Sequence, residues 1–152
     1  MFGFADDTIC LNETLTVLDS SIGADTYAWT ISNGENYSSA TVPEISFSAP
    51  GPHSVQLVVE NNAISCIDTL KKELIVQPIP AIIAKDEDFC LGDTIRVEAT
   101  GYSGLTYKWL PEELVNNSDS AKSISSANKS TDFTILVVDS NACTNSDVAN
   151  IY

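Results

Sequence analysis

The chain carries one pattern of aromatic residues and cysteines twice, and this repetition limits what it can fold into. The motifs Tyr27-Ala28-Trp29 and Tyr107-Lys108-Trp109 each place their tryptophan 19 residues after one cysteine and well before another. The four cysteines are Cys10 and Cys66 in the first copy, and Cys90 and Cys143 in the second. A period of about 80 residues predicts two domains, residues 1–78 and 79–152.

Strand signals are short, alternating and separated by turn residues, which predicts an all-β fold. Val55, Leu57 and Val59 alternate with polar residues in the first copy, as Phe133, Ile135 and Val137 do in the second. We expect the two motif tryptophans and tyrosines (Trp29, Trp109, Tyr27, Tyr107) to lie in the cores, because aromatic rings bury the largest apolar area. The polar segment Pro111–Lys129 predicts a loop with a short edge strand.

The cysteine count suggests cross-links, since a domain of roughly 75 residues has a marginal core. Two cysteines in each copy favour one disulfide per domain, Cys10–Cys66 and Cys90–Cys143, each worth about 3–4 kcal/mol in the chain-entropy model. Other pairings would tie the two copies to each other, and a cytosolic protein would keep four reduced thiols. Metal-ligand spacings are missing, which argues against a zinc site.

Charge and hydropathy indicate the kind of environment. The net charge is −14, from 21 acidic and 7 basic residues, which argues against nucleic-acid binding and against anionic membranes. No apolar run has the roughly 18–20 residues that span a bilayer. The start, Met1–Phe4, lacks the features of a secretory signal. Together with the expected disulfides, this leads us to expect a fragment of a larger extracellular protein.

Three stretches of the first copy resemble a PKD (polycystic kidney disease) domain. They are the strand motif Tyr27-Ala28-Trp29, the turn Phe47-Ser48-Ala49-Pro50-Gly51 and the alternating run Val55–Asn61. Stretches of the second copy are similar to Ig-like repeats of Bacteroidetes surface proteins: Cys90-Leu91-Gly92-Asp93-Thr94, Tyr107–Pro111 and Val137–Cys143. Ser32-Asn33-Gly34 replaces the Gly-Asp-Gly turn typical of PKD domains.

This resemblance implies two tandem Ig-like (PKD-like) β-sandwich domains. It further implies a non-catalytic spacer or stalk of a bacterial cell-surface adhesin, of the kind found in gliding adhesins and in cargo of the type IX secretion system. The expected partners are neighbouring repeats of the same polypeptide, and the expected state is a monomer. The alternative is a glycan-binding or protein-binding accessory module of a secreted hydrolase, for which Tyr37 and Tyr102 are the candidate stacking residues.

Catalytic signatures do not appear in the sequence, so we expect no enzymatic activity. His53 is the single histidine, and it follows a Pro-Gly-Pro turn that suggests a plain surface residue. A nucleophile requires a base held within hydrogen-bonding reach, and nothing in the sequence pairs His53 or any carboxylate with one. The established motifs of hydrolases, phosphate-binding loops and metalloproteases do not occur.

A divalent-cation site is the most specific chemical hypothesis. Acidic residues precede each first cysteine, and a polar loop precedes each second one. If the disulfides formed within the domains, Asp86, Glu87, Asp139 and Asn141 would approach each other. Calcium prefers six to eight oxygen ligands of this kind. The alternative is that the acidic loops keep an extracellular protein soluble.

Overall fold

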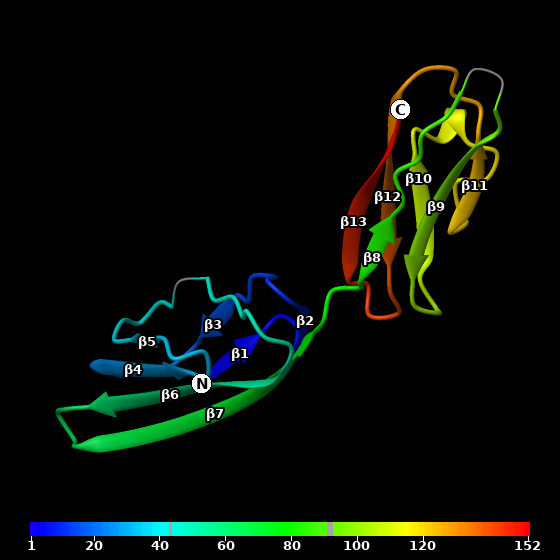
Figure 1. The fold of residues 1–152 in the computed structure, drawn as a ribbon. Helices are drawn as coiled ribbons and strands as arrows, with labels where there is room; N and C mark the ends of the chain where they lie inside the picture. The colour runs from blue at the N-terminus through cyan, green and yellow to red at the C-terminus, as the bar shows by residue number, and fades with distance from the viewer. Residues whose placement is uncertain (43, 91–92) are drawn as a thin grey trace. The chain divides into compact units, whose positions relative to one another are not determined.

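The computed structural model describes residues 1–42, 44–90 and 93–152. The chain divides into two compact units, Met1–Pro78 (unit 1) and Ile79–Tyr152 (unit 2), each with its own sheets and core. The described residues contain strands and one short 3₁₀ helix, Glu112–Leu114 (η1), and no α-helix (Figure 1). The Leu91-Gly92 part of the second-copy motif lies outside the described residues.

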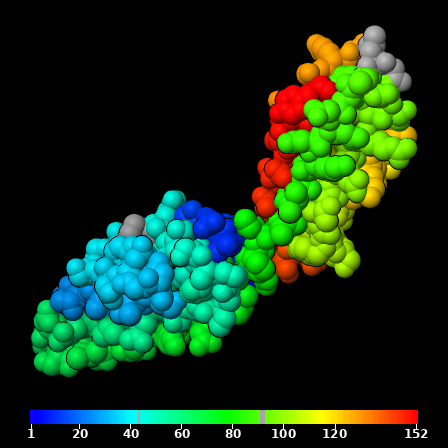
Figure 2. Space-filling model, viewed as in Figure 1, coloured from blue at the N-terminus to red at the C-terminus, as the bar shows by residue number. Residues whose placement is uncertain are grey.

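Unit 1 consists of a five-stranded sheet and a strand pair packed over its inner face. The large sheet has the order β2-β7-β6-β4-β5, and the pair is β1-β3. The strands are β1 (Phe2–Phe4), β2 (Thr8–Cys10), β3 (Val17–Asp19), β4 (Thr26–Ile31), β5 (Asn36–Tyr37), β6 (Gly51–Asn61) and β7 (Cys66–Gln77). Strand β2 runs parallel to β7, while the other neighbours are antiparallel. In Figure 2 the cyan chain around β5 covers much of the visible face of this unit.

Unit 2 consists of two three-stranded sheets, β10-β12-β13 and β11-β9-β8. The strands are β8 (Ile82–Ala84), β9 (Ile95–Gly101), β10 (Thr106–Leu110), β11 (Lys122–Ser125), β12 (Thr131–Val138) and β13 (Thr144–Ile151). Strand β11 is the short edge strand expected within the long polar segment. Strand β8 lies beside β13 as well as pairing with β9 (Figure 1).

The two units are built alike, with equivalent residues about 80 positions apart. Strands β4, β6 and β7 correspond to β10, β12 and β13 in order and direction. The bridge between Leu15 and Ile45 in unit 1 has its counterpart in the pair Ile95–Ser125 of unit 2. The parallel pairing of β2 with β7 recurs as a parallel bridge from Glu87 to Ile151. The sequence repeat is therefore a structural repeat.

A tryptophan lies at the centre of each core. Trp29 and Trp109 are 1% and 0% exposed, and Tyr27 and Tyr107 are partly buried against the same clusters. Each indole N–H donates to a backbone carbonyl, Trp29 to Ser39 at 3.0 Å and Trp109 to Ser120 at 2.9 Å. A buried indole N–H without a partner would destabilise the fold, so these bonds are part of the packing.

Two strand boundaries differ from the sequence expectation. The alternation of Leu15 and Val17 with polar residues predicts a strand over Thr14–Leu18, but β3 begins at Val17, and Leu15 makes only an isolated bridge. The sequence Pro50-Gly51-Pro52 predicts a break between strands, yet β6 begins within it at Gly51, whose φ of 121° suits glycine. Pro52 lies close to the start of the strand, where a missing N–H is tolerated.

We predict that Trp109→Ala unfolds unit 2 while unit 1 stays folded. Truncating a buried tryptophan costs about 3–5 kcal/mol, which is comparable with the whole stability expected of a domain this small. The fluorescence of Trp29, the remaining tryptophan, should stay that of a buried indole during the unfolding of unit 2 monitored by circular dichroism. Simultaneous exposure of Trp29 would contradict two separate cores.

Candidate functional site

The two cysteines of each repeat lie at opposite ends of their unit. The chain enters a unit at its leading end and leaves it at its trailing end. Cys10 and Cys90, the first cysteines of the two repeats, lie at trailing ends. Cys66 and Cys143, the second cysteines, lie at leading ends.

Each first cysteine begins a tight turn that an acidic residue closes. The N–H of Cys10 donates to Glu13 Oε2 at 2.7 Å, and the N–H of Cys90 donates to Asp93 Oδ2 at 2.9 Å. In return the N–H groups of Glu13 and Asp93 donate to the carbonyls of Cys10 and Cys90. Cys-x-x-Glu and Cys-x-x-Asp at the same offset in the two repeats are the sequence signal of this acidic cap, which the repeat pattern of cysteines and tryptophans alone does not predict.

Each second cysteine follows a turn with a left-handed residue just before it. Ser65 precedes Cys66 with φ of 51°, and Ala142 precedes Cys143 with φ of 64°. A side-chain oxygen organises both turns: Asn61 accepts from two backbone N–H groups of its own turn, and Asp139 does the same. Asn61 and Asp139 thus hold equivalent positions, and so do the cysteines that follow them.

The expected pairs Cys10–Cys66 and Cys90–Cys143 are wrong. Cys10 and Cys143 are disulfide-bonded, whereas Cys66 and Cys90 are free thiols and exposed to solvent. Each repeat therefore has one bonded and one free cysteine. The bonded cysteines comprise one of each kind, the first cysteine of repeat one and the second cysteine of repeat two.

The length of the last strand explains why the pair in unit 1 does not form. Cys10 lies opposite Gln77, the last residue of β7, whereas Cys66 is the first residue of the same strand. The strand has 12 residues, so at about 3.3 Å per residue its ends are about 35 Å apart. A disulfide requires Cα atoms within about 7 Å.

Unit 2 separates its cysteines in the same way. The N–H of Phe89 donates to the carbonyl of Tyr152 at 3.0 Å, which places Cys90 beside the end of β13. Cys143 immediately precedes Thr144, the first residue of that strand. The two cysteines are therefore about 30 Å apart along the extended chain.

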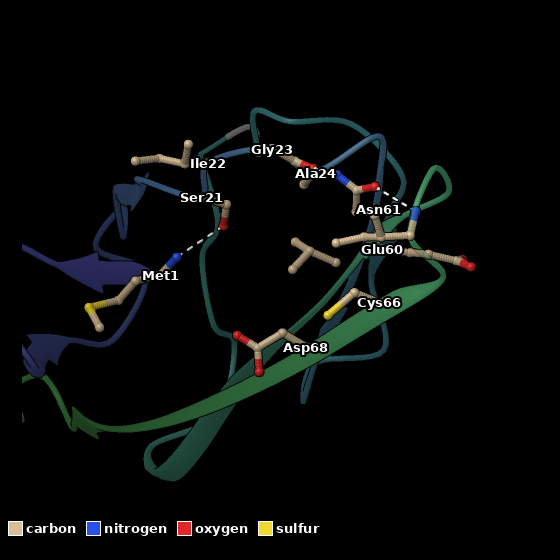
Figure 3. A pocket seen from close by; sticks show the side chains of 11 residues that line it. Met1, Ser21, Ile22, Gly23, Ala24, Glu60, Asn61, Cys66 and Asp68 are labelled. Atoms are coloured by element: carbon tan, nitrogen blue, oxygen red, sulfur yellow. Dashed lines mark hydrogen bonds between the residues drawn. The ribbon is translucent and has the colours of Figure 1, made fainter.

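Cys66 faces an open hollow at the leading end of unit 1. The hollow has a volume of about 340 Å³, and Met1, Ser21, Asp68 and Ile64 are among the residues that line it. Figure 3 shows the sulfur of Cys66 directed into it. The terminal amino group of Met1 donates to Ser21 Oγ at 3.0 Å across one side.

Apolar side chains that line the hollow or neighbour Cys66 in the sequence are largely exposed. Ile22 is 99%, Ile64 72% and Ile67 63% exposed. Ile22 and Ile64 line the hollow together with Cys66. These apolar side chains are exposed to water and would be more stable if they were packed against another protein surface.

The proposed calcium ligands are not brought together. Asp86 accepts from the N–H and side chain of Asn150, near the end of β13, and Glu87 forms a bridge to Ile151. Asp139 and Asn141 lie before the start of β13, in the turn that Asp139 organises. The length of β13 separates the two acidic groups, as it separates the two cysteines that were expected to join their loops. The described residues contain no cluster of three or more His, Cys, Asp or Glu suited to a metal ion.

His53 has a structural role that the sequence did not indicate. Its Nε2 lies 2.9 Å from the Ala49 carbonyl, and its Nδ1 lies 3.0 Å from Ser32 Oγ. Because a carbonyl only accepts, Nε2 carries the proton and Ser32 donates to Nδ1. The ring also packs on Phe47, with centroids 4.3 Å apart. The residue is partly buried, and it joins β6 to the turn before it.

The two candidate sugar-stacking tyrosines do not form one platform. Tyr37 lies opposite Trp29 in unit 1 and packs against the core. Tyr102 belongs to unit 2 and donates to Asp139 Oδ2 at 3.3 Å. Partial desolvation raises the pKa of Tyr102, and the Asp139 carboxylate adds to the effect.

Comparisons with known proteins identify the fold but not a family. No protein-family model and no curated protein sequence matches the chain. A fragment of intimin, solved in complex with the intimin-binding domain of the translocated intimin receptor, aligns with 99% of this chain at 12% identity and a TM-score of 0.53. This chain spans 63% of that fragment's length.

Two further solved structures align over almost the whole chain. The fibronectin(III)-like modules of Clostridium thermocellum CbhA cover 100% of it and 93% of their own chain, at 13% identity and a TM-score of 0.42. Drosophila N-cadherin EC1-4 covers 99% of it and 48% of its own chain, at 13% identity and a TM-score of 0.38. The neighbours are Ig-like, fibronectin(III)-like and cadherin-like modules, and the likeness to them concerns the all-β, Ig-like sandwich fold. Within the part of the chain that the structure describes, no helix is long and apolar enough to cross a bilayer.

Alkylation should separate the two kinds of cysteine. We predict that iodoacetamide, without reductant or denaturant, modifies two of the four cysteines, Cys66 and Cys90, because these are the exposed free thiols. All four should react after reduction in denaturant. Peptide mapping by mass spectrometry reads the sites. Modification of Cys10 or Cys143 in the untreated protein would contradict the assignment.

His53→Ala should destabilise unit 1 by about 1–2 kcal/mol, the loss of two hydrogen bonds and a ring contact. Urea unfolding monitored by Trp29 and Trp109 fluorescence measures the change. The exposed Glu44→Ala in the same unit is the matched control and should leave the midpoint unchanged. An unchanged midpoint in His53→Ala would mean that the residue is a plain surface residue without a structural role.

Proposed function

We propose that the chain is a non-catalytic repeat module of a larger cell-surface protein, in which it acts as an extracellular spacer or stalk. Its two units would be tandem Ig-like domains related to PKD domains, as in the adhesins of Bacteroidetes that move by gliding or use type IX secretion. Its immediate partners would then be neighbouring repeats of the same polypeptide. A spacer requires stable folds connected in series, and it requires no catalytic residues.

The observation that carries the proposal is the equivalence of the two units. They share the buried tryptophan and the hydrogen bond from its indole N–H to a backbone carbonyl. They also share the acid-capped turn of the first cysteine and the left-handed residue before the second. A site for catalysis or ligand binding would be expected to make one copy differ from the other. Repetition of structural details fits a chain that adds length by adding copies.

Three further features support an extracellular, non-catalytic role. Disulfide-bonded cysteines occur mainly in oxidising compartments. The net charge of −14 favours solubility of an exposed surface. The single histidine, His53, lies in none of the established catalytic motifs of hydrolases or metalloproteases.

A display experiment tests the spacer function. One, two and three copies of the chain are placed between a membrane anchor and a fluorescent tag on a bacterial surface. The distance of the tag from the membrane should grow in proportion to the copy number, because folded modules add fixed lengths. A Gly/Ser linker with matched residue counts is the control, and its reach should grow only with the square root of its length.

Two results would contradict the spacer function. One is square-root growth of the distance for the folded copies. The other is selective, saturable binding of the chain on a glycan array, which would favour the accessory-module alternative instead.

A further inference from the structure

We propose that Cys90 of one copy of the chain forms a disulfide with Cys66 of the next copy, so that successive modules are covalently linked head to tail. The inference rests on the proposed function as a serial repeat module. It gives a role to the two exposed thiols, Cys66 and Cys90, which form no disulfide within either unit.

Repeat equivalence is the first argument. Cys90 holds the position in unit 2 that Cys10 holds in unit 1, with the same acid-capped turn. Cys66 holds the position in unit 1 that Cys143 holds in unit 2, after the same left-handed residue. Both counterparts are disulfide-bonded: Cys10 is the first cysteine of its repeat, and Cys143 is the second cysteine of its repeat. The free thiols, Cys66 and Cys90, are likewise one second and one first cysteine.

The placement of each cysteine within its own unit is the second argument. The side chain of Asn145 donates to the Pro80 carbonyl at 2.8 Å, which places Cys143 at the leading end of unit 2. Cys66 lines the hollow beside Met1, at the leading end of unit 1. Cys90 lies beside Tyr152, where the chain leaves unit 2. A trailing-end thiol and a leading-end thiol are the two groups that meet when copies follow each other.

The surroundings of Cys66 supply a third, independent argument. Ile22 and Ile64 line the same hollow and are largely exposed. A second copy docked at this end would remove apolar surface from water while bringing its Cys90 to the thiol. The apolar side chains therefore give the linkage a non-covalent component that favours this geometry over random contact.

The bond forms by thiol–disulfide exchange, which balances with a small-molecule disulfide as oxidant. The Cys90 thiolate attacks oxidised glutathione, and one glutathione thiolate leaves. The Cys66 thiolate of the next copy then attacks the sulfur of Cys90 in the mixed disulfide, and the second glutathione leaves. The protein sulfurs are oxidised by two electrons, the oxidised glutathione is reduced by two, and the two thiol protons go to the released glutathione.

Electrostatic repulsion sets the conditions of the reaction. Each copy carries a net charge of −14, and acidic residues lie near both thiols, Asp68 in the hollow and Asp93 at the turn. Repulsion between copies slows their encounter at low ionic strength and is screened by salt. We therefore expect the rate of linkage to rise severalfold from low to physiological salt.

The test uses the full chain and the variants Cys66→Ser and Cys90→Ser, each of which keeps one free thiol. In a glutathione redox buffer at physiological salt, the unmodified chain should form a ladder of linked oligomers on a non-reducing gel. Mixing the two variants should give one covalent dimer, joined through Cys66 of one and Cys90 of the other by peptide mapping. This mixed dimer should exceed severalfold the homodimers that each variant forms alone.

Control measurements keep the outcome decisive. The double variant should stay monomeric, and unchanged melting temperatures show that the exposed serines leave the fold intact. Ile64→Asp should reduce the yield of the mixed dimer severalfold while leaving alkylation of Cys66 unchanged. Random pairing of the two variants, no linkage, or an internal Cys66–Cys90 bond would overturn the proposal. Those results would leave the linear growth of the displayed spacer unaffected, so the two proposals fail separately.

Discussion

The buried indole, on β4 in unit 1 and on β10 in unit 2, is the contact on which each unit depends. It fills the space between the two layers of its unit, and its N–H donates to a backbone carbonyl 10 or 11 residues further along the chain. In unit 1 the ring also meets the edge of Phe2, with centroids 5.1 Å apart, which ties the β1-β3 pair to the large sheet. One side chain thus supplies apolar area, a satisfied polar group and the connection between layers.

The sequence predicted the elements better than the contacts between their ends. Alternation marks β6 and β12 because one face of each strand is buried, and the motif tryptophans mark the centres of β4 and β10 for the same reason. The cysteine pairs failed because a pairing depends on register, which spacing along the chain does not contain. The decisive element is β2, whose three residues place Cys10 beside the end of β7. So short a strand leaves almost no periodic signal.

The acidic residues of the expected calcium site show a second limit of sequence reasoning. Asp86 and Asp139 each accept hydrogen bonds from backbone N–H groups, one at the end of a ladder and one in a turn. A carboxylate engaged in this way satisfies backbone donors that would otherwise be exposed to competition from water. A cluster of acidic residues looks the same in the sequence whether its carboxylates accept hydrogen bonds from backbone N–H groups or bind a cation. His53 illustrates the converse, because its two hydrogen bonds join segments that no motif connects.

The parallel pairing beside the last strand determines how each unit responds to tension. In unit 1 the N–H of Ile75 bonds the Asp7 carbonyl and the N–H of Leu11 bonds the Gln77 carbonyl, both at 2.8 Å. In unit 2 the same arrangement joins Glu87 and Phe89 to the end of β13. A force applied to the two ends of a unit pulls these parallel segments past each other. The hydrogen bonds are then loaded in shear and must break together, which makes a module of this kind resistant to drag along its length.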